Sequence, residues 1–432
     1  MRAVLVAPIS AVLLAQAPAV EPARLHATVA RLVGFGTRHT LSDTTSSTRG
    51  IGAARTWLRA EFEALAKAPG SRLRPFEDRF TADPGPRLPK ATELVNVGAV
   101  LPGKDPARSR EAIVLTGHYD SRASDVMDAS GDAPGAVDDG SGTALVLELA
   151  RVMAALEPAV TVYFVAVAGE EQGLVGSTHL AKRLKAEGVQ VLAMTSIDIA
   201  GNTEGQDGVK DNVSARLFSE GVSTVESDAQ RRLREATGGE NDGPAREWAR
   251  YVKRVAEAQV ANLDLWVMLR RDRLARGSDH TAFSREGFPA IRLSETHEHY
   301  DRQHQDVRVK EGRAYGDDLA HFDAAYTAKL ARGLQAAVTA LACAPAAPQE
   351  VVLGGAVSPD TALRWKLADS RAAGVVLYRR RADAVTWQRV TRLPRQERLT
   401  LKDVPPDNEV FAVASVDAEG HESLPAYPSR LE

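Results

Sequence analysis

Strand-like and helix-like hydrophobic patterns alternate along most of the chain. Apolar residues recur three and four positions apart over residues 21–65, which predicts helices. Patterns typical of strands, several of them apolar enough for burial on both faces, lie at 72–80, 93–103, 111–120, 161–169 and 191–201. Helical patterns at 141–155 and 174–187 separate the later strands. The alternation predicts an α/β fold with a mostly parallel mixed sheet sandwiched by helices.

The segment 202–260 interrupts this alternation. It is polar and rich in Gly, Asp and Glu, with one short strand-like stretch, SARLFS, and two helical stretches. We therefore expect an insertion or lid over the edge of the sheet. Strand patterns resume at 263–272 and 288–295, and a long helix from about Asp317 to Cys343 closes the domain.

The composition changes at residues 344–349, an Ala- and Pro-rich stretch that we interpret as a linker. From residue 350 to 432 only strand patterns remain, 8 to 12 residues apart with turn residues between them, which predicts a small all-β sandwich domain. Trp365, Tyr378 and the final stretch VFAVASVDAEGHES resemble a fibronectin type III module. This module contains no catalytic constellation, so we expect it to stabilise the protein or to attach it to a surface or polymer.

Charge and cysteine content remove some classes of function. The 432 residues include 54 Lys and Arg against 57 Asp and Glu, a net charge of −3, without Lys/Arg-rich runs. Nucleic acid is therefore not an expected partner. The single cysteine, Cys343, cannot form a disulfide within the chain.

The first residues resemble a secretory signal peptide. Met1 and Arg2 precede an apolar run over residues 3–14, and small residues suited to cleavage follow up to residue 19. A membrane span would need about 20 apolar residues, so this run predicts export rather than anchoring. We expect residues 1–19 to be removed and the protein to be secreted or periplasmic.

Five motifs with metal-ligand residue types fall at or just beyond the ends of predicted strands, where open α/β sheets collect ligand-binding groups. They are GHYDS (117–121), GAVDDGSG (135–142), AGEEQGLVGS (168–177), SIDIAGN (196–202) and EHYDRQHQD (298–306).

The first two motifs each allow two interpretations. His118 and Asp120 are two residues apart on a strand, so both project to one side, as a ligating imidazole and an orienting carboxylate would. HxD also occurs by chance. Asp138 and Asp139 lie in a Gly-rich turn before a helix, where Asp139 or Ser141 suits an N-cap, and capping can coexist with metal binding.

The next two motifs place carboxylates beside apolar strands. Glu170 and Glu171 are adjacent, and two buried carboxylates are costly unless a cation neutralises them. Since successive strand residues point to opposite faces, one glutamate can bind a metal while the other carries a proton. Asp198 lies between Ile197 and Ile199, a position that structure alone does not explain.

Over residues 90–342 this series of motifs resembles the secreted co-catalytic di-zinc aminopeptidases, the leucyl-aminopeptidase-like zinc exopeptidases. The resemblance implies a zinc peptidase domain over residues 20–343 that binds two Zn²⁺. It also implies one role for each matched residue: His118 and Asp198 on the first zinc, Asp138 bridging both, Glu171 and His304 on the second, Glu170 as general base, and Asp120 and Asp139 as orienting acids. Asp279 and His280, in GSDHTAF (277–283), match a stretch near the pocket and are expected to be structural.

The last histidine ligand has two candidates. His297, His299 and His304 lie within eight residues. We prefer His304, because the preceding apolar strand ends near Leu293 and the ligand loop should come some way beyond it. His299, which is followed by Tyr300, is the alternative.

The resemblance implies hydrolysis of the first peptide bond of a substrate with a free N-terminus. Three other functions stay open: a carboxypeptidase, a glutaminyl cyclase with one zinc, and a non-catalytic binding module. A carboxypeptidase needs cations for the terminal carboxylate, which Arg270, Arg271, Arg273 and Arg276 offer. Our default interpretation is that these arginines pair with Asp272 and the acidic insertion.

Overall fold

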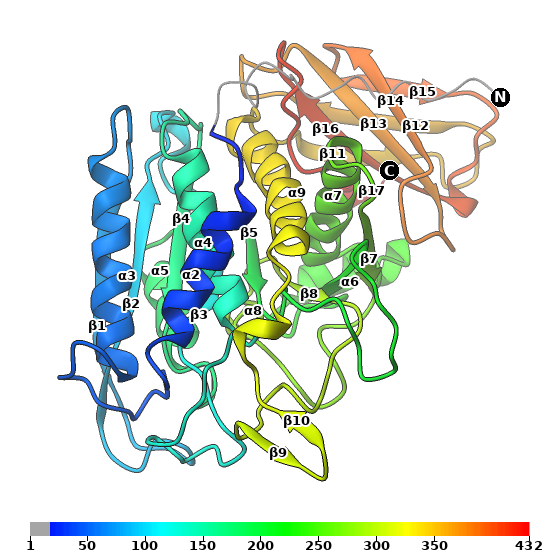
Figure 1. Ribbon diagram of the computed structural model, residues 1–432. Coiled ribbons are helices and arrows are strands. Elements are labelled where there is room, and N and C mark those ends of the chain that lie inside the picture. Colours follow the sequence, from blue (N-terminus) through cyan, green and yellow to red (C-terminus); the bar gives the residue numbers. More distant parts are fainter. Residues whose placement is uncertain (1–17, 432) are drawn as a thin grey trace.

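The computed structural model describes residues 18–431 (Figure 1). The signal segment predicted over residues 1–19 therefore lies almost wholly outside the described residues. Among the described residues, no helix is both long and apolar enough to cross a bilayer.

An eight-stranded mixed sheet forms the body of the larger domain, in the order β1-β2-β4-β3-β5-β8-β6-β7. Its strands are β1 (Arg74–Ala82), β2 (Thr92–Leu101), β3 (Glu111–His118), β4 (Thr161–Val167), β5 (Gln190–Ile197), β6 (Ser214–Ser219), β7 (Asp264–Met268) and β8 (Ala290–Glu295). β4, β3, β5 and β8 are parallel neighbours, whereas β1, β2 and β6 pair antiparallel with a neighbour.

Helices cover both faces of this sheet, as the α/β prediction required. The helices are α2 (Pro22–Val33), α3 (Gly50–Lys67), α4 (Gly140–Met153), α5 (Val175–Ala186), α6 (Asp228–Thr237), α7 (Pro244–Gln259), α8 (His280–Arg285) and α9 (Ala324–Cys343). α3, α4, α7 and α9 form the near layer in Figure 1, with α2 packed on α4 and α9. In β3, Ile113 and Leu115 pack into the core under that layer, and Val114 packs into a second core with α5 and α8. Burial on both faces explains why β3 is a continuous apolar run.

The segment 202–260 is built more deeply into the domain than its polar composition suggests. β6 lies between β8 and β7 in the sheet, and α7 packs against α9 with Trp248 fully buried. Trp248 donates a hydrogen bond to Thr195 of β5. The part that projects is therefore α6 with its flanking loops, because α6 has no buried residue.

The C-terminal domain is a sandwich of two small sheets, in the orders β15-β12-β11-β17 and β14-β13-β16. The strands are β11 (Gln349–Gly354), β12 (Thr361–Lys366), β13 (Gly374–Arg381), β14 (Arg389–Pro394), β15 (Arg398–Leu401), β16 (Glu409–Val416) and β17 (Arg430–Leu431). Trp365 and Phe411 belong to a core cluster that draws on both sheets. The predicted sandwich is confirmed, and its likeness to fibronectin type III stays a prediction.

Helix α7 lies beside the C-terminal sandwich (Figure 1), and its side chains make buried polar contacts with that domain. The Glu247 carboxylate accepts hydrogen bonds from Tyr427 Oη at 2.6 Å and Trp387 Nε1 at 2.9 Å. Arg250, beside it on α7, donates to the Val385 carbonyl at 2.6 Å. The linker is tied down as well, since Ala346 N donates to Asp369. The sandwich is therefore packed on the larger domain rather than loosely tethered to it.

Candidate active site

The predicted ligands converge at the carboxyl ends of neighbouring parallel strands. His118 is the last residue of β3, Asp198 directly follows β5, and Glu171 follows β4 after a short turn. Asp138 lies in the loop that leads into α4. His304 comes from the long loop between β8 and the small hairpin β9 (Arg308–Lys310) and β10 (Arg313–Tyr315). The topology thus gathers residues from five segments that are far apart in the sequence.

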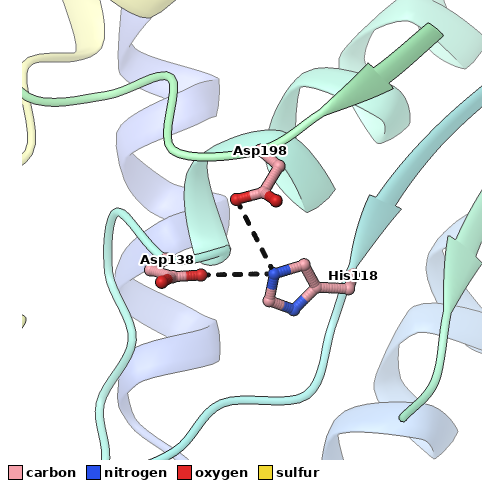
Figure 2. A group of neighbouring side chains, drawn as sticks. All are labelled: His118, Asp138 and Asp198. Atoms are coloured by element: carbon pink, nitrogen blue, oxygen red, sulfur yellow. Dashed lines mark ion pairs between the residues drawn. The ribbon is translucent and has the colours of Figure 1, made fainter. Parts of the chain in front are cut away.

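His118, Asp138 and Asp198 form the first ligand group (Figure 2). The His118 Nε2 atom lies 3.2 Å from Asp138 Oδ1 and 3.9 Å from Asp198 Oδ1. All three side chains are buried. Their facing atoms lie within 4.8 Å of one another, which is close enough to surround one ion.

Asp138, Glu171 and His304 form the second ligand group. His304 Nε2 lies 3.0 Å from Asp138 Oδ2 and 2.9 Å from Glu171 Oε1. Asp138 belongs to both groups and turns one oxygen towards each histidine. Asp138 is therefore the residue that the two ligand groups share.

The structure separates the two histidine candidates. His304 is at the site, while His299 belongs to neither ligand group, and its Nδ1 is buried without a hydrogen bond. His297 contacts Asp207 at 2.9 Å, away from the ligands. His304 adopts a positive φ of 52°, and this local turn of the backbone gives no signal in the sequence.

The charges around the two histidines favour a cation. Burial alone would lower the pKa of His118, but Asp120, Asp138 and Asp198 raise it well above its ordinary value. Burial also opposes the charge on His304, yet Glu171 and Asp138 raise its pKa to about 10. A divalent metal satisfies the same excess of carboxylates.

Unpartnered buried atoms show that the residues fit such a metal. His118 Nε2 and Glu171 Oε1 are buried and make no hydrogen bond. Such atoms are rare in folded proteins, because burying an unpaired polar atom costs about 1–3 kcal/mol. Imidazole nitrogens together with carboxylate oxygens form a donor set typical of zinc.

Asp120 contacts two segments of the site. One of its carboxylate oxygens lies 3.6 Å from His118 Nδ1, and its own carbonyl oxygen lies nearer to that atom, at 3.1 Å. The carboxylate also accepts hydrogen bonds from the backbone N–H groups of Glu170 and Glu171, at 3.2 and 3.1 Å, and from the Thr40 hydroxyl. His118 and the two N–H groups hold the pKa of Asp120 below its ordinary value although burial would raise it. Asp120 therefore positions the Glu170–Glu171 turn.

Asp139 combines the two roles that the sequence allowed. One carboxylate oxygen accepts from Gly142 N at 2.8 Å and so caps α4. The other accepts from His118 N at 3.0 Å and joins the start of α4 to the end of β3. The cap thus also fixes the backbone of a ligand.

Glu170 lies beside the ligands in the wall of an open cleft of about 1030 Å³. Asp138, Glu171, Asp198 and His304 line the same cleft. Burial raises the pKa of the Glu170 carboxyl well above its ordinary value, and the Glu171 carboxylate raises it further. A carboxyl with a raised pKa is suited to accept and return a proton near neutral pH.

Two supporting residues were missed by sequence reasoning. Asp317 accepts hydrogen bonds from Val137 N at 2.9 Å and Asp138 N at 2.7 Å, so it fixes the loop that carries the shared carboxylate. Arg292 lies on β8, where its guanidinium is 3.2 Å from Asp198 Oδ1. Neither residue belongs to a motif. The available signal was the presence of a charged residue in a buried segment, which requires a partner of opposite charge or hydrogen-bond donors.

Asp279 and His280 are fully buried, as expected of residues near the pocket. His280 Nε2 lies 2.9 Å from the Arg271 carbonyl, a structural contact. Burial raises the pKa of the Asp279 carboxyl to about 7, and neither of its oxygens makes a hydrogen bond.

Three of the four arginines between residues 270 and 276 form ion pairs, and one does not. Arg271 pairs with Glu220 at 3.3 Å, Arg273 with Asp272 at 3.1 Å, and Arg276 with Glu298 at 2.9 Å. The Arg270 side chain has no ion pair or hydrogen bond within residues 18–431. The default interpretation therefore holds for Arg271 and Arg273, whereas Arg276 pairs with Glu298, which lies outside the insertion.

Comparisons with known proteins agree with this site. Residues 96–317 match peptidase family M28. A probable zinc metalloprotease of Leptosphaeria maculans is 39% identical over 411 residues, which cover 95% of each chain. One of Pyricularia oryzae is 40% identical over 422 residues, covering 95% of this chain and 82% of that protein.

The fold is also that of solved structures. LapA of Legionella pneumophila superposes with a TM-score of 0.52 at 21% identity, over 75% of this chain and 74% of LapA. LapB of the same organism gives 0.50 at 22% identity, over 74% and 71%. With half of its length matched by the family, and with relatives this similar along almost the whole chain, the protein belongs to peptidase family M28.

Proposed function

We propose that this protein is a di-zinc aminopeptidase, which hydrolyses the first peptide bond of substrates with a free N-terminus. The observation that carries the proposal is the Asp138 carboxylate, whose two oxygens face His118 and His304 separately. One metal ion needs only one such group. Two groups that share a carboxylate support two ions, and the relatives' description as probable zinc metalloproteases supports zinc.

His118 and Asp198 would hold one zinc, Glu171 and His304 the other, and Asp138 both. When bound, such ions polarise a peptide carbonyl and lower the pKa of water. Arg292 and Asp317 keep Asp198 and the Asp138 loop in place for this role.

Glu170 would transfer the proton. It adjoins the ligand Glu171, and the bonds to Asp120 fix the backbone of both residues. In the proposed reaction its carboxylate accepts a proton from the attacking water and donates it to the departing amine. The raised pKa of Glu170 matches this double role.

Carboxylates at the floor of the cleft support an N-terminal specificity. Glu170, Glu171, Asp138 and Asp198 all line it, and an ion held by these groups can bind a free α-amine, which a blocked N-terminus does not offer.

Two peptides test the proposal, one with a free and one with a blocked N-terminus, both with free carboxyl ends. We expect the zinc-loaded protein to release the first amino acid from the free peptide alone. Cleavage of the blocked peptide from its carboxyl end would instead assign a carboxypeptidase. Cyclisation of an N-terminal glutamine without hydrolysis, with one zinc per chain, would assign a glutaminyl cyclase.

The variant Glu170→Gln tests the mechanism. It retains size and hydrogen bonding but cannot accept the proton, so turnover should be abolished while zinc content is unchanged. Full activity of this variant would rule out Glu170 as the base.

We also propose that residues 1–19 direct export and that the C-terminal domain, of fibronectin type III kind, stabilises the peptidase domain. The buried contacts of Glu247 with Tyr427 and Trp387 support stabilisation. N-terminal sequencing of the exported protein should show a start after Ala17 or Ala19, and a start at Met1 would refute the signal peptide.

A further inference from the structure

The cleft above the ligands has an arginine-rich wall. Eight of its lining residues are arginines, whereas Glu220 and Asp272 are its only lining acids outside the ligands and Glu170. The four acids at the floor are those that two zinc ions would neutralise. The remaining wall is therefore strongly basic.

Some of these arginines are already neutralised within the protein. Arg271 pairs with Glu220 at 3.3 Å, and both Arg273 and Arg276 lie 2.9 Å from Glu298. Their charges stabilise the wall and are not free for a ligand.

Arg246 and Arg270 have no such partner. Arg246 is 7% exposed, and its guanidinium donates only to the carbonyls of Glu240 and Leu269 and to the side chain of Asn241. Its Nε is buried without a hydrogen bond. Arg270 is exposed, and its side chain makes no ion pair or hydrogen bond with any described residue.

The two arginines are neighbours in space. Arg246 Nη2 lies 3.0 Å from the carbonyl of Leu269, the residue that precedes Arg270. A Cβ atom at Gly221 would stand 2.6 Å from Arg246 Cζ, so any side chain there would displace the guanidinium. Glycine at position 221 therefore leaves room for the Arg246 guanidinium in the wall of the cleft.

A buried cation without a counter-ion is costly, and an anionic ligand removes that cost. Burial and the nearby Arg250 lower the pKa of Arg246, and Asp242, which pairs with Arg250 and Arg380, offsets this only in part. Arginine presents a planar set of donors that matches a carboxylate.

We propose that Arg246 and Arg270 form a subsite for a substrate carboxylate, beyond the bond that is cleaved. The inference rests on the proposed function and narrows its substrates to peptides that carry a carboxylate near their N-terminus. Such a peptide is complementary to the cleft, with its first peptide bond at the metal ligands and its carboxylate at the basic wall. The carboxylate is either an acidic side chain or the C-terminus of a dipeptide.

Three substrates separate these two sources: leucyl-aspartyl amide, leucyl-asparaginyl amide and free leucyl-asparagine. Because a hydrogen bond to a charged group contributes about 1.5–3 kcal/mol, we expect kcat/KM for the carboxylate-bearing substrate to exceed that for the neutral amide by about tenfold or more. A gain with leucyl-aspartyl amide assigns the acidic side chain, and a gain with leucyl-asparagine assigns the C-terminus. Equal values for all three would overturn the proposal.

Arg270→Gln tests the assignment to this wall. Because the Arg270 side chain has no partner within residues 18–431, its replacement should leave the fold intact and reduce the preference for the carboxylate to about threefold or less. Arg232→Gln is the matched control, since Arg232 is an exposed arginine on α6 outside the cleft. An unchanged preference in Arg270→Gln would refute the assignment.

Binding to Glu170→Gln separates the failure of this inference from that of the proposed function. In calorimetry with this variant, leucyl-aspartyl amide should bind about tenfold more tightly than leucyl-asparaginyl amide, whatever the reaction is. If the unchanged protein hydrolyses none of the peptides while the variant keeps this binding preference, the aminopeptidase proposal alone is refuted. Hydrolysis of all three peptides without any preference would refute the subsite alone.

Discussion

Asp120→Asn perturbs the turn on which the proposed mechanism depends. The Asp120 carboxylate is fully buried and accepts three hydrogen bonds, from Glu170 N, Glu171 N and the Thr40 hydroxyl. Asparagine has the same shape but only one acceptor oxygen, and its amide group donates. At least one backbone N–H group of the turn must therefore lose its acceptor.

The magnitude follows from these contacts. A buried N–H group without an acceptor costs about 1–3 kcal/mol, and the remaining bonds lose the contribution of a charged acceptor, so we expect a loss of about 2–4 kcal/mol in the free energy of unfolding. Movement of the turn displaces both Glu170 and Glu171. Since a shift of about 1 Å can cost about 100-fold in rate, kcat/KM should fall by about 10- to 100-fold.

Urea unfolding of the metal-free protein measures the stability, and kcat/KM at saturating zinc measures the activity. Thr40→Val is the matched control, because it removes one of the three bonds and leaves the carboxylate, so it should cost about 1 kcal/mol. If Asp120→Asn unfolds like the unchanged protein and is fully active, Asp120 does not position the turn.

Three other predictions concern the domain contact and the metal. Tyr427→Phe removes the 2.6 Å bond to the buried Glu247 carboxylate and should lower the free energy of unfolding by about 2 kcal/mol, whereas Tyr300→Phe, at an exposed position, should not change it. Burial raises the pKa of the Glu247 carboxyl above 4.5, so its ionisation opposes folding. The free energy of unfolding, relative to that of Glu247→Gln, should therefore fall as the pH rises from about 4 to 7. An increase over this range would contradict the raised pKa. Chelation of the metal should abolish peptide hydrolysis and lower the melting temperature, both restored by zinc, and activity retained in excess chelator would show that hydrolysis needs no metal.

The fold and most of the site residues could be predicted because their signals are local. Apolar runs such as β3 reflect burial on both faces, and adjacent acids such as Glu170 and Glu171 after such a run require compensation. These residues stand at strand ends, so the topology alone brings them together.

The remaining features depend on distant contacts. The choice of His304 over His299 depends on a backbone turn in a long loop, and Asp317 lies 179 residues after Asp138 in the sequence. The position of β6 between β8 and β7 could not be predicted, because the sequence around this short strand is polar. Asp120 is part of the motif GHYDS, but its hydrogen bonds with the N–H groups of Glu170 and Glu171 depend on the fold and leave no signal in the sequence.

The zinc content of three proteins tests the central claim most directly: the unchanged chain, His304→Ala and His299→Ala. Asp138 is shared between two ligand groups, and His304 belongs to one of them whereas His299 belongs to neither. We therefore predict two zinc ions per chain, one in His304→Ala and two in His299→Ala. One zinc in the unchanged chain, or a loss in His299→Ala with two ions kept in His304→Ala, would contradict the site described above.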